Sequence, residues 1–364
     1  MLLLNMLGGF LRHDRLLGSA HRTDLYSTPH FRGTLQCERE RVDRSGGCFS
    51  LVCFTAPAGR AGLAALRAVG RLLPRQLRLL DRAGWLSGCS IGVSLPNTPA
   101  DGAWVLVKKI MLSLPEETAR LNCRVYCYPM SWPSDARGAA NLAGAAASSA
   151  IPASAAGPIE AYFVQPLPAW KRALDILGAS FGLLVLSPLL LGTAVVIKCT
   201  SPGPILFRQL RSGLGSQPFR MIKFRSMVID AEARQKDLMA LNEQDGPAFK
   251  IKSDPRVTSI GRFIRATSID ELPQLWNVLV GEMSLVGPRP LPCHESDACR
   301  GWQRQRLSAT PGLTCIWQLT GRSMVTFAEW MRMDIRYIRS RTLGHDLSLL
   351  FRTAFTLLLR RTGC

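Results

Sequence analysis

The sequence predicts an α/β protein in two parts: a small soluble α/β domain at the N-terminus, followed by a mainly helical, membrane-associated domain. Three observations support this division. Strand-like and helix-like patterns alternate between residues 31 and 133. Residues 136–158 are rich in Ala, Ser and Gly, as linkers are. Residues 176–197 carry no charge. We therefore expect an N-terminal domain at 1–135, a linker at 136–166 and a second domain at 167–364.

The composition narrows the classes of function. The 364-residue chain has a formal net charge of +19 and 47% hydrophobic residues, enough for folded cores. A basic surface suits nucleic acid, anionic lipid or phosphate-bearing small molecules. Because the sequence holds no zinc finger, basic zipper or RNA-stacking platform, we do not expect nucleic-acid binding. The eleven Cys residues lack CxxC spacing, so we expect free thiols and no structural zinc.

The first domain is expected to run helix, strand, helix, strand, helix, strand. Two of the helices can be given bounds, and both show apolar residues at helical spacing. Pro74 should interrupt the first of these two helices. The strands show β-branched and aromatic residues. We place helices at 62–80 and 100–114, and strands at 49–54, 90–96 and 123–129.

This order resembles a degenerate diguanylate-cyclase-type (GGDEF) domain. In that family a hairpin turn carries Gly-Gly-Asp/Glu-Glu-Phe. Here residues 86–98 read LSGCSIGVSLPNT, without a carboxylate, and residues 51–57 (LVCFTAP) lack the family's metal-binding Asp. The resemblance therefore implies the fold without cyclase activity. Element order alone leaves an unrelated small α/β domain open.

The uncharged run at 176–197 is long enough to cross about 30 Å of hydrocarbon. Pro188 should kink a helix there, and Ser187 can bond the carbonyl that the proline leaves free. Cations flank both ends, at Lys171, Arg172 and Lys198, so charge favours neither orientation. A re-entrant helix, a kinked transmembrane span and a buried core helix all remain open on these grounds.

Two adjacent carboxylates, Asp270 and Glu271, lie in the stretch TSIDELPQLWNVLVGEMSLVGPRP (267–290), before an apolar helix. Ser268 and Glu271 fit a capping box, and Pro273 fits a first helical turn. At a helix N-terminus the dipole should lower their pKa values, which would keep them ionised to bind a metal ion or attack an electrophile. Acidic first turns are common in helices, so the pair alone identifies no site.

Basic and turn-forming segments accompany the acid pair. Residues 206–227 are rich in Arg, Lys and Gly, which suits a polyphosphate. Arg289 stands between two prolines, and residues 310–322 combine a Pro-Gly turn with an arginine. Together with an adjacent membrane segment, these features indicate phosphoryl transfer at a lipid surface.

These segments resemble the bacterial sugar transferase family, the monotopic polyprenyl-phosphate hexose-1-phosphate (phosphoglycosyl) transferases. The similarity covers 167–363 and depends on KRALDILGASFGLLVLSPLLL, GPILFRQLRSG, FRMIKFRSM, SIDELPQLWNVLVGEMSLVGPRP, PGLTCIWQLTGR and MDIRYI. It implies a re-entrant helix broken at Ser187-Pro188. It also implies a location at the bacterial inner membrane, with the active site on the cytoplasmic face and the first domain as a soluble accessory.

The resemblance implies a mechanism and a set of site residues. Asp270 would attack the β-phosphate of a UDP-sugar, UMP would leave, and polyprenyl (undecaprenyl) phosphate would take the sugar phosphate from the aspartyl intermediate. Glu271 would help to bind Mg²⁺. Cys315 stands where the family usually has Gly. The residues expected around the phosphates and the nucleotide are Lys223, Arg289, Arg211, Arg225, Gln318 and Arg322.

The product would initiate glycan assembly of the exopolysaccharide or O-antigen type, with downstream glycosyltransferases as further partners. An alternative function is a catalytically silent membrane scaffold of glycan assembly, regulated by the N-terminal domain.

Overall fold

The computed structural model describes residues 25–114, 121–129, 159–235, 237–251, 253–299, 301–320 and 325–359. It divides into two units, Met1–Ala156 and Gly157–Cys364. Most of the expected linker lies outside the described residues. Its last part, Ile159–Phe163, is a 3-10 helix, and the buried Glu160 pairs with Arg304 of the second unit. The second unit therefore begins inside the segment that the sequence assigned to the linker.

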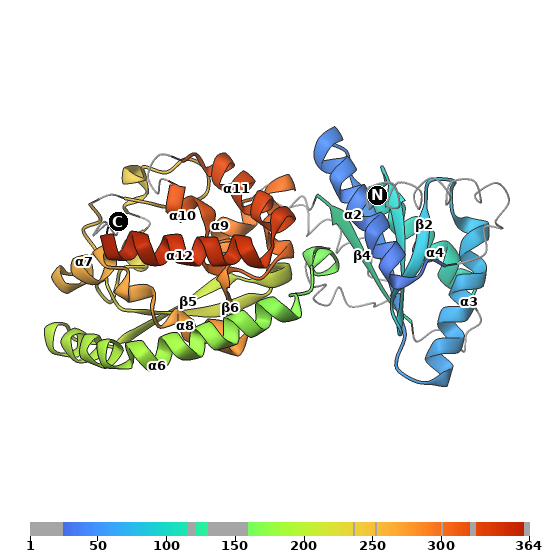
Figure 1. The fold of residues 1–364 in the computed structure, drawn as a ribbon. Helices are drawn as coiled ribbons and strands as arrows, with labels where there is room; N and C mark the ends of the chain where they lie inside the picture. Colours follow the sequence, from blue (N-terminus) through green and yellow to red (C-terminus); the bar gives the residue numbers. More distant parts are fainter. Residues whose placement is uncertain are drawn as a thin grey trace, which may run out of the picture. The chain divides into compact units, whose positions relative to one another are not determined.

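The first unit is a four-stranded antiparallel sheet in the order β2-β3-β1-β4 (Figure 1). Helices α3 and α4 share a hydrophobic core with one face of the sheet, and α2 packs on the other. The elements are α2 (Thr28–Ser45), β1 (Phe49–Thr55), α3 (Arg60–Gln76), β2 (Arg82–Ser87), β3 (Ser90–Pro96), α4 (Ala100–Leu112) and β4 (Asn122–Tyr128).

The strands and helices that the patterns predicted are present, and β2 is an addition. Its sequence, RAGWLS, has few strand-forming residues and a glycine inside. Gly84 is paired with Gly92, and a Cβ on either would come within 2.6 or 2.5 Å of the Phe31 side chain. The two glycines make room for an aromatic ring of α2, which a local strand pattern does not reveal. Pro74 lies in the last turn of α3, which ends at Gln76.

The second unit is mainly helical, with an antiparallel β5–β6 hairpin and a short parallel β7–β8 pair. Figure 1 shows the long helix α6 along one side of the unit, where it packs on α8. The elements are α6 (Ala169–Thr200), β5 (Leu206–Ser212), β6 (Pro218–Phe224), α7 (Ser259–Ala266), α8 (Gln274–Val280), β7 (Ser284–Val286), α9 (Cys293–Asp297), β8 (Gly312–Thr314), α10 (Ile316–Thr320), α11 (Phe327–Ser340) and α12 (Leu343–Leu359).

Helix α6 is continuous through Ser187 and Pro188, so the structure does not show the expected break. Pro188 has no N–H to donate to the carbonyl of Leu184, four residues earlier. The Ser187 hydroxyl donates to that carbonyl instead, at 2.8 Å. The Leu184 carbonyl therefore has a hydrogen-bond donor within the helix, as expected for a serine beside the proline. This bond accounts for the uninterrupted course of α6 through Pro188.

In the part of the chain that the structure describes, α6 is the one helix long and apolar enough to cross a membrane; its most apolar window has a mean hydropathy of 2.2 and is 11% buried. One side packs on the unit through Ala179 and Ile197. The other side leaves large apolar side chains exposed, among them Leu177, Phe181 and Leu184. A core helix would bury these residues, so their exposure indicates membrane association.

Both ends of α6 are fastened to the same unit. Near its start, Arg172 donates to the carbonyls of Val278 and Leu279 at 2.8 and 2.7 Å, and so caps the C-terminus of α8. At its end, Arg225 donates to the carbonyl and hydroxyl of Ser201 at 2.9 and 2.6 Å. The helix therefore lies along the surface of its own unit rather than extending away from it.

Candidate active site

Asp270 and Glu271 lie in a 3-10 turn, Ile269–Glu271, just before α8. The expected capping box is wrong. Ser268 has left-handed backbone angles (φ 58°, ψ 16°) and makes no side-chain cap, and α8 begins only at Gln274. Cations hold the Glu271 carboxylate instead of the backbone N–H that a capping box would offer.

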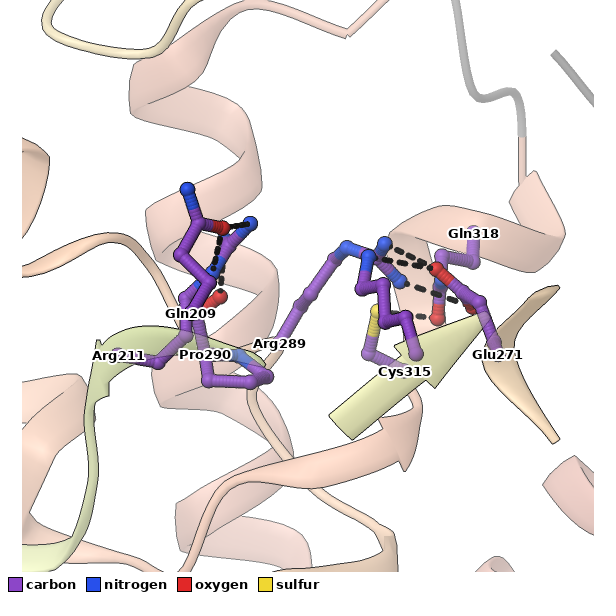
Figure 2. Close-up of polar contacts among 8 residues, drawn as sticks. Gln209, Arg211, Glu271, Arg289, Pro290, Cys315 and Gln318 are labelled. Atoms are coloured by element: carbon purple, nitrogen blue, oxygen red, sulfur yellow. Dashed lines mark hydrogen bonds and ion pairs between the residues drawn. The ribbon is translucent and has the colours of Figure 1, made fainter. Parts of the chain in front are cut away.

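Glu271 is held by two cations that the sequence had selected, Lys223 and Arg289, and Figure 2 shows its contact with Arg289. Arg289 donates to both carboxylate oxygens: Nη1 to Oε2 at 3.3 Å, and Nη2 to Oε1 in a shorter contact. Lys223 Nζ lies 3.5 Å from Oε1. All three side chains are at most 22% exposed, so these pairs are only partly screened by water. The fold thus brings together the β6 strand, the turn before α8 and the segment after β7.

Asp270 is buried, with 8% of its surface exposed. Within the described residues, no side chain donates a hydrogen bond to its carboxylate. Burial raises the pKa of Asp270 to about 6, although the nearby Lys223 lowers it. The expected lowering by a helix dipole is therefore wrong, because the turn is buried. At neutral pH the carboxylate is still mostly ionised, and no hydrogen bond within the described part occupies its oxygens.

The two cations respond differently to burial. Burial lowers the pKa of Lys223 to about 8, although Glu271 opposes this shift. Burial also lowers the pKa of Arg289, but the charge and hydrogen bonds of Glu271 raise it by more. Arg289 therefore keeps its charge at every physiological pH, whereas Lys223 can titrate just above neutrality.

Two other arginines that the sequence selected have partners away from the acid pair. Arg211 donates to Gln209 Oε1 at 2.9 and 2.6 Å and to the Pro290 carbonyl at 2.9 Å (Figure 2). Burial lowers its pKa to about 10. Arg225 is buried at the end of α6, bonded to Ser201. In the structure Arg211 holds the Pro290 carbonyl, next to Arg289, whereas Arg225 holds the end of α6.

Gln318 and Cys315 lie beside the Glu271–Arg289 pair in Figure 2. The Cys315 thiol donates to Gln318 Oε1 at 3.0 Å. Cys315 is buried, and burial raises its pKa, so the thiol stays protonated. Arg322, the remaining expected site residue, lies outside the described residues.

Asn277 is a positioning residue that the sequence analysis did not select. It is fully buried. Its Oδ1 accepts from Ile222 N–H at 3.0 Å, and its Nδ2 donates to Arg220 O at 2.9 Å and to Glu282 Oε2 at 2.6 Å. These bonds join α8 to β6 beside Lys223. A polar residue inside the apolar run LWNVLV was the available clue.

Arg306 is a second such residue. It donates to the backbone carbonyl of Arg289 and, at 3.0 and 2.7 Å, to the buried Asp334 carboxylate. Burial raises the pKa of Asp334 to about 6. The Arg306–Asp334 pair thus fixes the backbone from which the Arg289 side chain reaches Glu271.

The donors present fit a magnesium ion that takes its other ligands from substrate. Among the described residues there is no group of three or more His, Cys, Asp or Glu side chains that could hold a metal ion. Mg²⁺ is commonly bound by one or two carboxylates together with substrate phosphates and water. Asp270 and Glu271 supply such carboxylates, although Glu271 would have to exchange a cation contact for the metal.

Comparison with known proteins covers mainly the second unit. The family model for bacterial sugar transferases matches residues 167–360. The chain is 44% identical over 190 residues to galactosyl transferase CpsE of Streptococcus agalactiae serotype III. The matched residues cover 52% of this chain and 42% of that protein. It is 41% identical over 201 residues to undecaprenyl-phosphate galactose phosphotransferase of Salmonella typhimurium, covering 53% of this chain and 41% of that protein.

A third relative matches over more of its own length. The UDP-glucose:undecaprenyl-phosphate glucose-1-phosphate transferase of Caulobacter vibrioides is 43% identical over 198 residues, which cover 52% of this chain and 69% of that protein. By contrast, the chain spans about two fifths of the length of the Streptococcus and Salmonella proteins.

Among solved structures, a DGC protein from Thermotoga maritima is similar with 17% identity and a TM-score of 0.28, over 35% of this chain and 98% of that chain. With so low a TM-score, the GGDEF-type fold of the first unit stays a prediction. The family match covers more than half of the chain and contains the acid pair with both of its cations. The chain belongs to the bacterial sugar transferase family.

Proposed function

We propose that this protein transfers a sugar 1-phosphate from a UDP-sugar to a polyprenyl phosphate, with release of UMP. The observation that carries the proposal is the unequal acid pair: Asp270 is buried without a hydrogen bond in the described residues, while Glu271 is held by Lys223 and Arg289. The names of the Salmonella and Caulobacter relatives, which specify transfer to undecaprenyl phosphate, support the same reaction.

Asp270 is the proposed nucleophile. An oxygen of its carboxylate forms a bond to the β-phosphorus of the UDP-sugar, and the bond from that phosphorus to the bridging oxygen breaks, so that UMP leaves with the electron pair. An oxygen of polyprenyl phosphate then attacks the same phosphorus. The aspartyl–phosphorus bond breaks, which regenerates the carboxylate and yields polyprenyl-diphosphate-sugar. Two steps let a soluble nucleotide and a lipid use one small site in turn.

Glu271, Arg289 and Lys223 are proposed to manage the charge of the diphosphate. Lys223 and Arg289 both contact Glu271, the residue next to the proposed nucleophile. We propose that they bind phosphate oxygens when substrate enters. Glu271, once released from a cation, is the proposed ligand for Mg²⁺. When bound, Mg²⁺ would neutralise charge that builds up on the diphosphate. The remaining proposed contacts for the phosphates and the nucleotide are Gln318, Arg322, Arg211 and Arg225.

The proposed placement is monotopic, with the active site at the cytoplasmic face of a bacterial inner membrane. Both ends of α6 bind the same unit, so a transbilayer path would require one unit to contact both membrane faces. Immersion of the exposed face of α6 in one leaflet avoids this. The acid pair precedes α8, which packs on α6, so the reaction would occur beside the lipid. The re-entrant path that we propose would require α6 to bend at Ser187-Pro188 within that leaflet, where the helix is continuous in this structure.

The product would be a lipid-linked sugar, which suits glycosyltransferases that extend exopolysaccharide or O-antigen-type chains. The test uses the full protein in membranes with polyprenyl phosphate and a panel of UDP-sugars. UMP release is expected with at least one sugar, and mass spectrometry of the stalled first step should find a phosphosugar on Asp270. Asp270→Asn should abolish both signals, while Asp230→Asn, at an exposed acid of the same unit, should leave them unchanged. Turnover in Asp270→Asn would exclude the nucleophile, and binding without turnover in the unaltered protein would favour a silent scaffold.

A further inference from the structure

The outward face of the α3–α4 layer in the first unit is unusually cationic. We call this surface the α3–α4 face. Its exposed charged side chains are Asp101 and the six cations Arg60, Arg67, Arg71, Arg75, Lys108 and Lys109. Six cations and one acid give a net charge of +5. In the described part of the chain, none of the six cations forms an ion pair with an acidic side chain.

The same face exposes apolar side chains. Trp104, Val105 and Leu112 of α4 are 42%, 55% and 81% exposed, and Leu63 of α3 is 37% exposed. The core of the unit is filled from the opposite side of α4, so folding does not require these residues. Lys108 follows Trp104 by one helical turn and precedes Leu112 by another, so cations and apolar groups alternate along one helix face.

This combination differs from an ordinary solvated surface. Helix α2, on the other face of the sheet, mixes its arginines with Glu38, Glu40 and Asp43. A surface that pairs a cluster of Lys and Arg with Trp and aliphatic side chains is typical of elements that bind at the boundary between lipid headgroups and acyl chains. A partner for the α3–α4 face should therefore be anionic and extended, with apolar material just beneath its charges.

We propose that the α3–α4 face binds the anionic headgroups of the bilayer that holds α6. Lipid phosphates would accept hydrogen bonds from the arginines and lysines, and Trp104, Val105 and Leu112 would enter the headgroup region. Because the first unit is covalently joined to a membrane-associated unit, its effective concentration at the bilayer is high, so weak contacts suffice.

The test places a photo-crosslinker on the face in the full-length protein. p-Benzoylphenylalanine replaces Trp104 in one sample and, as a control, the exposed Arg32 of α2 in another. Each is reconstituted in vesicles of phosphatidylcholine with or without phosphatidylglycerol, and irradiated. Lipid adducts are counted by mass spectrometry. We expect adducts at position 104 to exceed those at position 32 severalfold when phosphatidylglycerol is present, and high salt to remove the difference.

Neutralising the face gives a second measurement. Arg67→Gln, Arg71→Gln, Lys108→Gln and Lys109→Gln together should lower the lipid adducts at position 104 at least about tenfold, since each cation near an anionic bilayer contributes about a factor of five. Equal adducts at positions 104 and 32, or adducts that do not depend on phosphatidylglycerol, would overturn the proposal. Crosslinks from one chain to another in place of lipid adducts would overturn it too, by assigning the face to a second copy.

Discussion

Asn277 offers a sharp test of how the site is supported, through the change Asn277→Asp. The substitution keeps the side-chain shape and the oxygen that accepts from Ile222 N–H. It removes the donor that bonds Arg220 O and Glu282 Oε2 at 2.9 and 2.6 Å. A second carboxylate would then face that of Glu282 at a fully buried position. The variant should therefore be destabilised by the loss of these two hydrogen bonds and by repulsion between the two carboxylates.

The expected loss follows from the two bonds. A neutral hydrogen bond contributes about 1 kcal/mol and a charge-assisted one about 1.5–3 kcal/mol. Adding repulsion between two carboxylates, the free energy of unfolding should fall by about 3–5 kcal/mol. In a unit of this size, each kcal/mol lost from the free energy of unfolding lowers the unfolding temperature by about 2–4 °C. The unfolding temperature should therefore fall by roughly 10 °C.

The assay is thermal unfolding of the full protein in detergent, followed by tryptophan fluorescence. The control pairs the variant with Glu282→Gln, whose amide can donate to the new carboxylate. Glu282 is exposed, so Glu282→Gln alone should change little, whereas the double variant should recover about 1–2 kcal/mol. A loss below about 1 kcal/mol in Asn277→Asp, or no recovery in the double variant, would refute the account of how α8 is joined to β6.

Two further predictions concern the acid pair. Transfer needs Asp270 ionised and Lys223 protonated, so the rate should rise with pH through about 6 and fall through about 8. Lys223→Arg should keep the lower limb and lose the upper one, because Arg stays charged; an upper limb that persists near pH 8 would contradict the assignment. Arg289→Lys should lower kcat/KM by about 10–100-fold, because one ammonium replaces a guanidinium that contacts both Glu271 oxygens. A variant as active as the unaltered enzyme would show that this two-point contact is dispensable.

Local patterns in the sequence predict the elements of the first unit well, because most of its strands and helices carry their own periodicity. They miss β2, whose Gly84 makes sense only beside Gly92 and the Phe31 ring. The sequence also places Asp270, Glu271, Lys223 and Arg289 in one site through a family resemblance, and the structure brings these four together.

Where a local pattern misleads, the reason is a tertiary contact with a residue far away in the sequence. The string Ser-x-x-Glu indicates a capping box, but Glu271 meets two cations from β6 and from the segment after β7, which lie elsewhere in the sequence. Arg211 and Arg225 belong to a basic segment, and in the structure they donate to the Pro290 carbonyl and to Ser201, so their contact with phosphate stays a prediction. Local sequence does not distinguish an arginine that binds backbone carbonyls from an arginine that binds phosphate.

The adjacent acids illustrate how burial divides two chemically similar groups between two tasks. A carboxylate already bonded to two cations has its lone pairs committed, so Glu271 is a poor nucleophile and a good holder of positive charge. A buried carboxylate without such bonds keeps its lone pairs, and burial raises the pKa of Asp270, which makes it a better nucleophile than an ordinary aspartate. The geometry therefore favours Asp270 as the nucleophile independently of the family resemblance.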